Sequence, residues 1–191
     1  MVWPLVLLTL SPAQADDGLR LAASVPATQR AIFDLRLGAL AAPGLGPDTV
    51  GQACGRLQPV RRISVEACGN GAGVFHDQAG ADFAHFRLTA APWQRHARGV
   101  DWSLGVGGGI AEVQRSKDAP GFRFGAARAD QVEAAGAEAT LGLTARRHND
   151  GVGHWVMDLT AGVAHIPGAP AVMGAAGPTV PFVGLSMGAG I

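Results

Sequence analysis

The chain has 191 residues, of which 15 are basic and 15 are acidic, so its formal net charge is zero. A neutral chain lacks the electrostatic attraction that drives binding to nucleic acid or to acidic membrane surfaces. Its hydrophobic fraction of 48% is too high for a disordered chain, and its length suits one domain.

The N-terminal segment, residues 1–15, predicts a signal peptide. An apolar run from Val2 to Leu10 leads to Ala13-Gln14-Ala15, and small residues at the first and third positions before a cut fit the pockets of a signal peptidase. The run is too short to span a bilayer, which takes about 20 residues. We therefore expect export, with residues 16–191 forming a single domain.

The rest of the chain predicts strands, because large apolar residues recur at every second position and no segment shows a long apolar period of 3.6 residues. In chain order, the predicted strands cover about residues 30–41, 60–68, 80–91, 99–113, 121–128, 135–147, 154–166 and 179–191. Together they predict an all-β fold, an antiparallel up-and-down β-barrel of about eight strands. Residues 41–79 are expected to hold a long loop or a disulfide-stapled hairpin, and Pro92 to Gly99 a connection between strands.

The two faces of the predicted strands differ in character. One face carries large apolar side chains, such as Trp155, Met157 and Leu159, and the other carries mostly Gly, Ser, Thr and single charges. In a water-soluble sandwich the large face forms the core. In a membrane barrel the large face contacts lipid and the small polar face fills a narrow lumen. Periodicity alone does not separate these arrangements.

Three features favour the membrane arrangement. The predicted strands are near the 9–11 residues needed to cross a bilayer, the second face is rich in Gly and poor in Lys, and the alternation of the last strand reaches Ile191. This pattern, over most of residues 16–191, resembles small bacterial outer-membrane β-barrels. The resemblance implies location in the outer membrane, contact with outer-membrane lipid, and recognition of the last strand by the barrel-insertion machinery.

Cys54 and Cys68 are the only cysteines, and an oxidising compartment favours a disulfide between them. A membrane-crossing strand over 60–68 would place Cys68 at its far end, with Cys54 in the preceding loop. Nine residues extend about 30 Å, whereas a disulfide needs Cα atoms within about 7 Å. Either the disulfide is absent, or residues 54–68 form a small stapled hairpin that turns near Pro59; the hairpin is the preferred interpretation.

Two glycine-containing motifs lack the context that their chemistry needs. Gly184-Leu185-Ser186-Met187-Gly188 matches the nucleophile elbow of hydrolases, but neither an acid nor a histidine follows it. Gly105 and the run 107–109 do not complete a dinucleotide-binding fingerprint, because Ile110 follows and no helix start is near. Both stretches are interpreted as small residues on the inward face of strands.

The histidines do not predict a metal site. None of them forms an H-x-H or H-E-x-x-H pair, although His148 and His154 flank one predicted turn and are candidates to lie close together. The six histidines are His76, His85, His96, His148, His154 and His165. We predict no metal, no cofactor and no catalytic residue.

Charged residues on the small-residue face are expected to meet inside a closed barrel. They are Asp34, Arg36, His85, Arg87, Asp101, Glu138, Arg146 and Asp158. A buried charge needs a partner, so the predicted arrangement is an ion-pair network that fills the lumen, with Arg146 and Asp158 opposite or diagonal to each other. A lipid-modifying hydrolase would instead need a Ser, a His and an acid converging at one rim.

The leading interpretation is a small outer-membrane β-barrel, not an enzyme, with a filled lumen and a structural or surface-interaction role through its loops. One alternative is a secreted or periplasmic β-barrel or sandwich that binds an apolar ligand. The other is the outer-membrane lipid-modifying hydrolase. The first predicts that Trp102, Leu141, Met157 and Leu185 face outward, and the second packs the same residues in a core.

Overall fold

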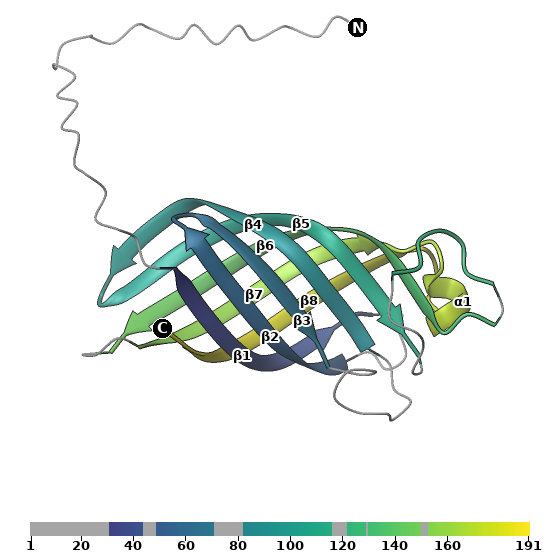
Figure 1. The fold of residues 1–191 in the computed structure, drawn as a ribbon, viewed down its shortest axis with the longest axis horizontal. Helices are drawn as coiled ribbons and strands as arrows, with labels where there is room; N and C mark the ends of the chain where they lie inside the picture. The colour runs from purple at the N-terminus through teal and green to yellow at the C-terminus, as the bar shows by residue number, and fades with distance from the viewer. Residues whose placement is uncertain (1–30, 44–48, 71–81, 116–121, 129, 150–152) are drawn as a thin grey trace, which may run out of the picture.

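The chain forms a closed barrel of eight antiparallel strands in a computed structural model, which describes residues 31–43, 49–70, 82–115, 122–128, 130–149 and 153–191. Each strand pairs with the next along the chain, and the last pairs with the first (Figure 1). The strands are β1 (Ile32–Ala41), β2 (Thr49–Val60), β3 (Ile63–Gly69), β4 (Asp82–Ala97), β5 (Val100–Gln114), β6 (Glu133–His148), β7 (His154–His165) and β8 (Thr179–Gly190). One short helix, α1 (Ala169–Met173), precedes β8. The predicted fold class is therefore confirmed.

The two ends of the barrel differ in the length of their connections. At the end where β1 begins and β8 ends, neighbouring strands are joined by Arg61-Arg62, Arg98-Gly99 and residues 149–153. At the opposite end, which carries α1, the connections are residues 42–48, 70–81, 115–132 and 166–178 (Figure 1). We call these the short-turn end and the long-connection end.

The structure corrects two of the predicted strands. Residues 121–128 were expected to form a strand, but the part of them that the structure describes, 122–128, makes only an isolated bridge between Phe124 and Ala135. Conversely, the segment 41–79, expected to hold a long loop or a disulfide-stapled hairpin, contains β2, whose residues 49–58 pair with β1. The total of eight strands holds because the missed strand replaces the wrongly predicted one.

The predicted connection from Pro92 to Gly99 is also corrected. Strand β4 continues through Pro92 to Ala97 and pairs with β5 beyond a shift of register between Ala90 and Trp93. Proline is tolerated at such an irregularity because the ladder hydrogen bond that it lacks is already interrupted there. The turn itself needs only Arg98 and Gly99, both with positive φ, as a two-residue hairpin turn requires.

The alternation of side chains along the strands separates the outside of the barrel from its inside: the large apolar residues lie mostly outside and the small or polar residues lie mostly inside. Leu141, Met157 and Leu185 are 58%, 45% and 46% exposed on the outer surface, and their strand neighbours Thr140, Asp158 and Ser186 are buried in the lumen. The arrangement that packs the large residues in a core is therefore wrong. Within the described part of the chain, no helix is long and apolar enough to cross a membrane.

An apolar cluster closes the lumen at the long-connection end. The aromatic rings of Phe83 and Phe182 meet edge to face, with centroids 5.4 Å apart, and both side chains are almost fully buried. Val172 of α1 and Ile166 of the preceding segment belong to the same buried cluster, as does Leu40 of β1. The helix therefore covers this end of the barrel with apolar side chains.

Candidate functional site

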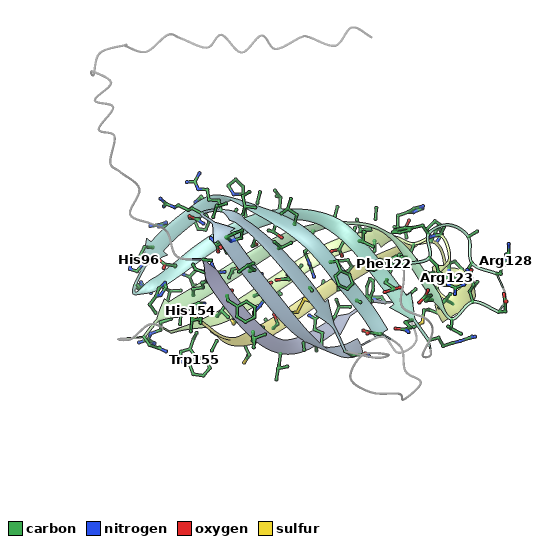
Figure 2. All side chains as sticks on the ribbon, in the orientation of Figure 1. His96, Phe122, Arg123, Arg128, His154 and Trp155 are labelled. Atoms are coloured by element: carbon green, nitrogen blue, oxygen red, sulfur yellow. A yellow bond between two sulfur atoms is a disulfide. The ribbon has the colours of Figure 1, made fainter. Side chains whose placement is uncertain are left out.

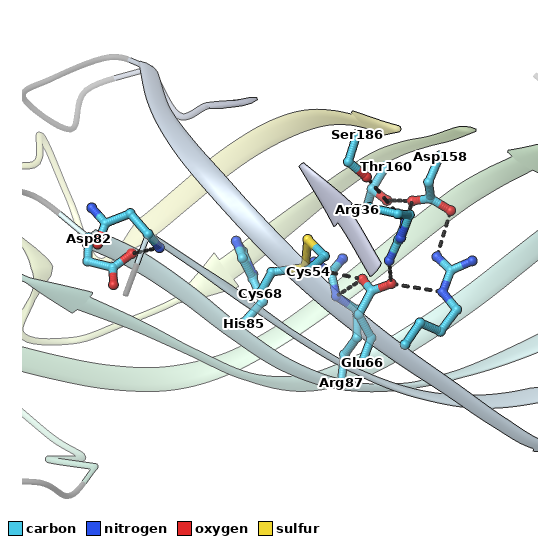
Figure 3. The surroundings of a disulfide bond; sticks show 12 residues. Arg36, Cys54, Glu66, Cys68, Asp82, His85, Arg87, Asp158, Thr160 and Ser186 are labelled. Atoms are coloured by element: carbon cyan, nitrogen blue, oxygen red, sulfur yellow. Dashed lines mark hydrogen bonds and ion pairs between the residues drawn. A yellow bond between two sulfur atoms is a disulfide. The ribbon is translucent and has the colours of Figure 1, made fainter. Parts of the chain in front are cut away.

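The central part of the lumen holds a network of ion pairs between strands. Arg56 on β2 contacts two carboxylates: its Nε lies 2.8 Å from Glu66 Oε2 on β3, and its Nη2 lies 2.6 Å from Asp158 Oδ2 on β7. Arg36 on β1 pairs with the same two acids, at 3.2 Å from Asp158 and in direct contact with Glu66 (Figure 3). Two arginines and two carboxylates thus form a closed ring of contacts across the barrel.

The network extends toward the apolar cluster through β4. Arg87 Nε lies 3.2 Å from Glu66 and 3.6 Å from Glu138 on β6, and His85 Nδ1 lies 2.5 Å from Glu138 Oε2. The His85 ring contacts the rings of Phe83 and Phe182, with centroids 4.5 and 4.7 Å away. His85 therefore lies where the polar lumen meets the apolar cluster.

A separate branch lies nearer the short-turn end. Asp34 on β1 accepts a hydrogen bond from Arg146 Nη2 at 2.9 Å and contacts His154 Nε2. Arg146 lies diagonal to Asp158 in the register of β6 and β7, as predicted, but the two do not pair: Arg146 pairs with Asp34, and Asp158 pairs with Arg36 and Arg56. The register places Asp158 opposite Thr144 and Arg146 opposite Val156, and each charge finds its partner across the lumen instead.

The network is balanced in charge and almost completely buried. We use the name ion-pair network for Arg36, Arg56, Arg87 and Arg146 together with Asp34, Glu66, Glu138 and Asp158. All eight residues are at least nine-tenths buried. Removing so many charges from water costs free energy unless each charge is paired. Equal numbers of arginines and carboxylates offset this cost. The prediction of a lumen filled by ion pairs is confirmed.

Each of the two Asp158 carboxylate oxygens also accepts a hydrogen bond from a hydroxyl group. Thr144 Oγ1 donates to Oδ2 at 2.6 Å, and Thr160 Oγ1 donates to Oδ1 at 2.7 Å. Ser186, the central residue of the G-x-S-x-G match, accepts a hydrogen bond from Arg36 at 3.3 Å. No hydrogen bond among the described residues joins a serine to a histidine, so a serine hydrolase centre gains no support.

The disulfide between Cys54 and Cys68 lies inside the barrel, on the wall formed by β2 and β3. The two residues face each other in the register of these strands, with Cα atoms 4.1 Å apart, and both are buried (Figure 3). The predicted disulfide and hairpin are confirmed, but the hairpin turns at Arg61-Arg62 rather than near Pro59. It is part of the barrel wall, because residues 49–60 form a strand.

Histidines at the short-turn rim cluster around Asp101. This aspartate was expected inside the barrel but lies at its rim, where His96 Nδ1 is 2.6 Å and His148 Nε2 is 3.0 Å from its oxygens. His148 and His154 are close, as predicted, with ring centroids 5.5 Å apart. Figure 2 shows His96 and His154 at this end of the barrel. Among the residues that the structure describes, no group of three or more His, Cys, Asp or Glu side chains is arranged to hold a metal ion.

The inward glycines of β5 leave space for the backbone of the neighbouring strand and for side chains in the lumen. A Cβ atom on Gly109 would lie 2.0 Å from the Phe86 carbonyl oxygen, and one on Gly107 would lie 2.6 Å from Thr140 Oγ1. Both glycines face inward, whereas Gly108 faces outward. The interpretation of this run as small residues on the inward face of a strand, and not as a nucleotide-binding loop, therefore holds for Gly107 and Gly109.

A polar recess opens at the short-turn end, above the ion-pair network. Its empty volume is about 480 Å³, part of which is open to solvent. Arg56, Glu66 and Asp158 lie at its base, and Arg62 and Gln94 are among the residues at its mouth. The recess is lined by hydroxyl, amide, guanidinium and carboxylate groups, so its chemistry differs from that of an apolar ligand cavity.

Comparisons of this chain with known proteins found no relative. No protein-family model, no curated protein sequence and no solved structure matches the chain.

Proposed function

We propose that the protein is a small outer-membrane β-barrel with a closed interior, whose role is structural or lies in surface interactions through its long connections. The proposal goes beyond the fold, and it is supported by the distribution of side chains over the outer and inner surfaces. The signal peptide expected at residues 1–15 is consistent with it but lies outside the described residues.

The observation that carries the proposal is an uncharged belt around the outside of all eight strands. Its outward positions are every second residue in 33–41, 51–59, 63–69, 84–90, 102–110, 137–145, 155–163 and 181–191, and all are Gly, Ala, Pro, Val, Leu, Ile, Met, Phe or Trp. We call this the outer belt. An exposed surface in water normally carries many charges, whereas lipid-facing positions exclude them. Within the same ranges, the charged side chains point into the lumen.

Aromatic side chains border the outer belt at both ends. Phe33 and Trp155 lie on the outer surface near the short-turn end, with Trp93 on the extension of β4. Near the other end, Phe86 of β4 and Phe122 meet edge to face on the outside, with ring centroids 5.2 Å apart. Figure 2 shows Trp155 and Phe122 in these two regions. Two aromatic girdles are typical of membrane barrels, since these rings prefer the interface between lipid and water.

The unequal connections support an orientation. Outer-membrane barrels have short turns on the periplasmic side and longer loops outside. By this rule, Arg61-Arg62 and Arg98-Gly99 face the periplasm, and α1 with the long connections faces the exterior. Any surface partner would then meet the end of the barrel that carries α1 and the segment 166–178.

The interior argues against a diffusion pore. The lumen of an eight-stranded barrel is just wide enough for side chains to fill, and here the ion-pair network and the apolar cluster occupy successive levels of it. We therefore expect a reconstituted protein to give no stable porin-like conductance in a planar bilayer.

Membrane fractionation combined with gel electrophoresis tests the proposal. The protein is expected in the outer-membrane fraction and should migrate faster when unheated, because a folded barrel resists detergent until it is boiled. Parallel samples with reductant report whether the disulfide forms in the cell. Recovery in the soluble periplasmic fraction would contradict the proposal, as would migration that does not depend on heating.

A further inference from the structure

The polar recess at the short-turn end is lined by polar groups that have no partner among the residues that the structure describes. Gln58 on β2 and Ser64 on β3 line the recess, each is only 8% exposed, and neither side chain makes a hydrogen bond to any described residue. The Nε atom of Arg146, also lining the recess, is buried without a hydrogen-bond partner. A buried donor is costly when unsatisfied, so Arg146 Nε points to a bound solute or solvent, and the side chains of Gln58 and Ser64 line the same recess.

The mouth of the recess carries a positive charge that the network does not compensate. The four arginines and four carboxylates of the ion-pair network balance one another, whereas Arg62 forms no ion pair with a described residue. Arg61, beside it, donates from Nε to Gln94 Oε1 at 3.3 Å. This contact occupies the oxygen of Gln94, whose side chain also lines the recess, and leaves its amide nitrogen as a donor. The free groups are therefore mainly donors.

We propose that this recess binds a compact anion, such as a phosphate group or the carboxylate of a small water-soluble molecule. Arg62 supplies the uncompensated charge, and Arg146 Nε and the amide of Gln94 supply further N–H donors. Charge-assisted hydrogen bonds from guanidinium groups to such oxygens are among the strongest in proteins. The carboxylates at the base, Glu66 and Asp158, are each held by two or more arginines, which offsets their repulsion of an anion.

The same phosphate chemistry occurs in free anions and in lipid headgroups, and the position of the recess favours the free anion. The lining side chains point into the lumen, away from the outer belt, so a lipid seated on the belt would have to send its headgroup over the rim. The inference does not depend on the membrane location, because the recess is a feature of the barrel itself.

Isothermal titration calorimetry with inorganic phosphate tests the proposal, on protein in a non-ionic detergent at constant ionic strength set with chloride. We expect saturable binding at one site. Arg62→Gln should weaken it about tenfold, as loss of a hydrogen-bonded charge implies. Arg98→Gln is the matched control, since Arg98 also has positive φ in a two-residue turn at this end but does not line the recess. It should change the dissociation constant less than twofold.

Three results would overturn the proposal: no saturable binding to the unmodified protein, equal affinity in Arg62→Gln, or equal losses in Arg62→Gln and Arg98→Gln. Unheated gel migration of each variant verifies that the barrel is folded. A second titration in bilayer discs, with and without phosphatidylglycerol, addresses the source of the anion. Phosphate affinity should be the same in both discs, and competition by the anionic lipid would overturn the assignment to a free anion.

Discussion

Arg56 and Asp158 lie 102 positions apart in the sequence, on β2 and β7, yet Nη2 of the arginine is 2.6 Å from Oδ2 of the aspartate. Strands β1 and β8 separate them around the barrel wall, so this contact crosses the lumen. Because Arg56 also pairs with Glu66 and Asp158 also pairs with Arg36, the two residues connect opposite walls through one buried network. The polar interior thus contributes to holding the barrel closed.

Replacing Asp158 should therefore destabilise the barrel strongly. Asp158→Asn keeps the shape of the side chain but leaves Arg36 and Arg56 with less compensating charge in a buried site. We expect the free energy of unfolding to fall by about 3–5 kcal/mol, the cost of breaking a buried pair. Urea unfolding in detergent micelles measures it. Asp101→Asn at the exposed rim is the control, with an expected loss of at most about 1 kcal/mol. Equal losses in the two variants would show that the network does not stabilise the fold.

The disulfide should contribute independently of the ion pairs. Cys54 and Cys68 close a loop of about 15 residues, for which the chain-entropy model gives about 3 kcal/mol. We expect dithiothreitol to lower the urea midpoint of the unmodified protein and to leave that of the double variant Cys54→Ala/Cys68→Ala unchanged. The same effect of reductant on both proteins would mean that it does not act through this bond.

Two adjacent glycines of β5 should respond oppositely to alanine. In Gly109→Ala the new methyl group would collide with the Phe86 carbonyl oxygen, so the strands must shift, at a cost of about 1–3 kcal/mol. In Gly108→Ala the nearest atom is the Glu138 carbonyl oxygen at 3.4 Å, an ordinary contact, and the lost flexibility of the unfolded chain makes the change neutral or slightly stabilising. Thermal unfolding of the two variants measures the difference. Equal stabilities would contradict the inward placement of Gly109.

The sequence predicted those strands whose two faces differ in side-chain size. Strands β6 to β8 alternate large residues with small or polar ones, and their predicted positions agree with the structure to within two residues. Strand β2 escaped prediction because its outward residues Gly51, Ala53 and Gly55 are small while its inward residues are polar, so the size contrast is lost. Residues 121–128 were wrongly predicted to form a strand because Phe122 and Phe124 alternate with the charged residue Arg123. These residues are not part of the barrel wall.

The interior charges could be predicted as a set, but their partners could not. The alternation along each strand places Asp34, Glu138 and Asp158 on the inward face from local pattern alone. Which arginine meets which carboxylate depends on how far the strands are staggered when the barrel closes, and local sequence does not contain that information. Glu66 and Arg56 were missed, since they lie in the segment 41–79 that was expected to be a long loop or a stapled hairpin.

A charged residue on the outer surface should destabilise the protein more, the closer it lies to the middle of the bilayer. Leu141 lies in the middle of the outward face of β6, and Leu141→Arg should lower the stability of the protein in phospholipid vesicles by about 2–4 kcal/mol. His165 faces outward at the end of β7, so His165→Arg should cost no more than about 1 kcal/mol. Refolding into vesicles under urea compares the two. A barrel whose outer face meets water would tolerate both variants equally.

The central claim, that the outer belt contacts lipid, is tested most directly by nitroxide labels on the protein in vesicles. Single cysteines at Leu141 and at Arg147, both outward on β6, carry the label in the Cys54→Ala/Cys68→Ala background. We expect the label at 141 to collide mainly with oxygen, which concentrates in lipid, and the label at 147 to collide mainly with a water-soluble nickel chelate. Strong collision of the chelate with both labels would place the belt in water and contradict the claim.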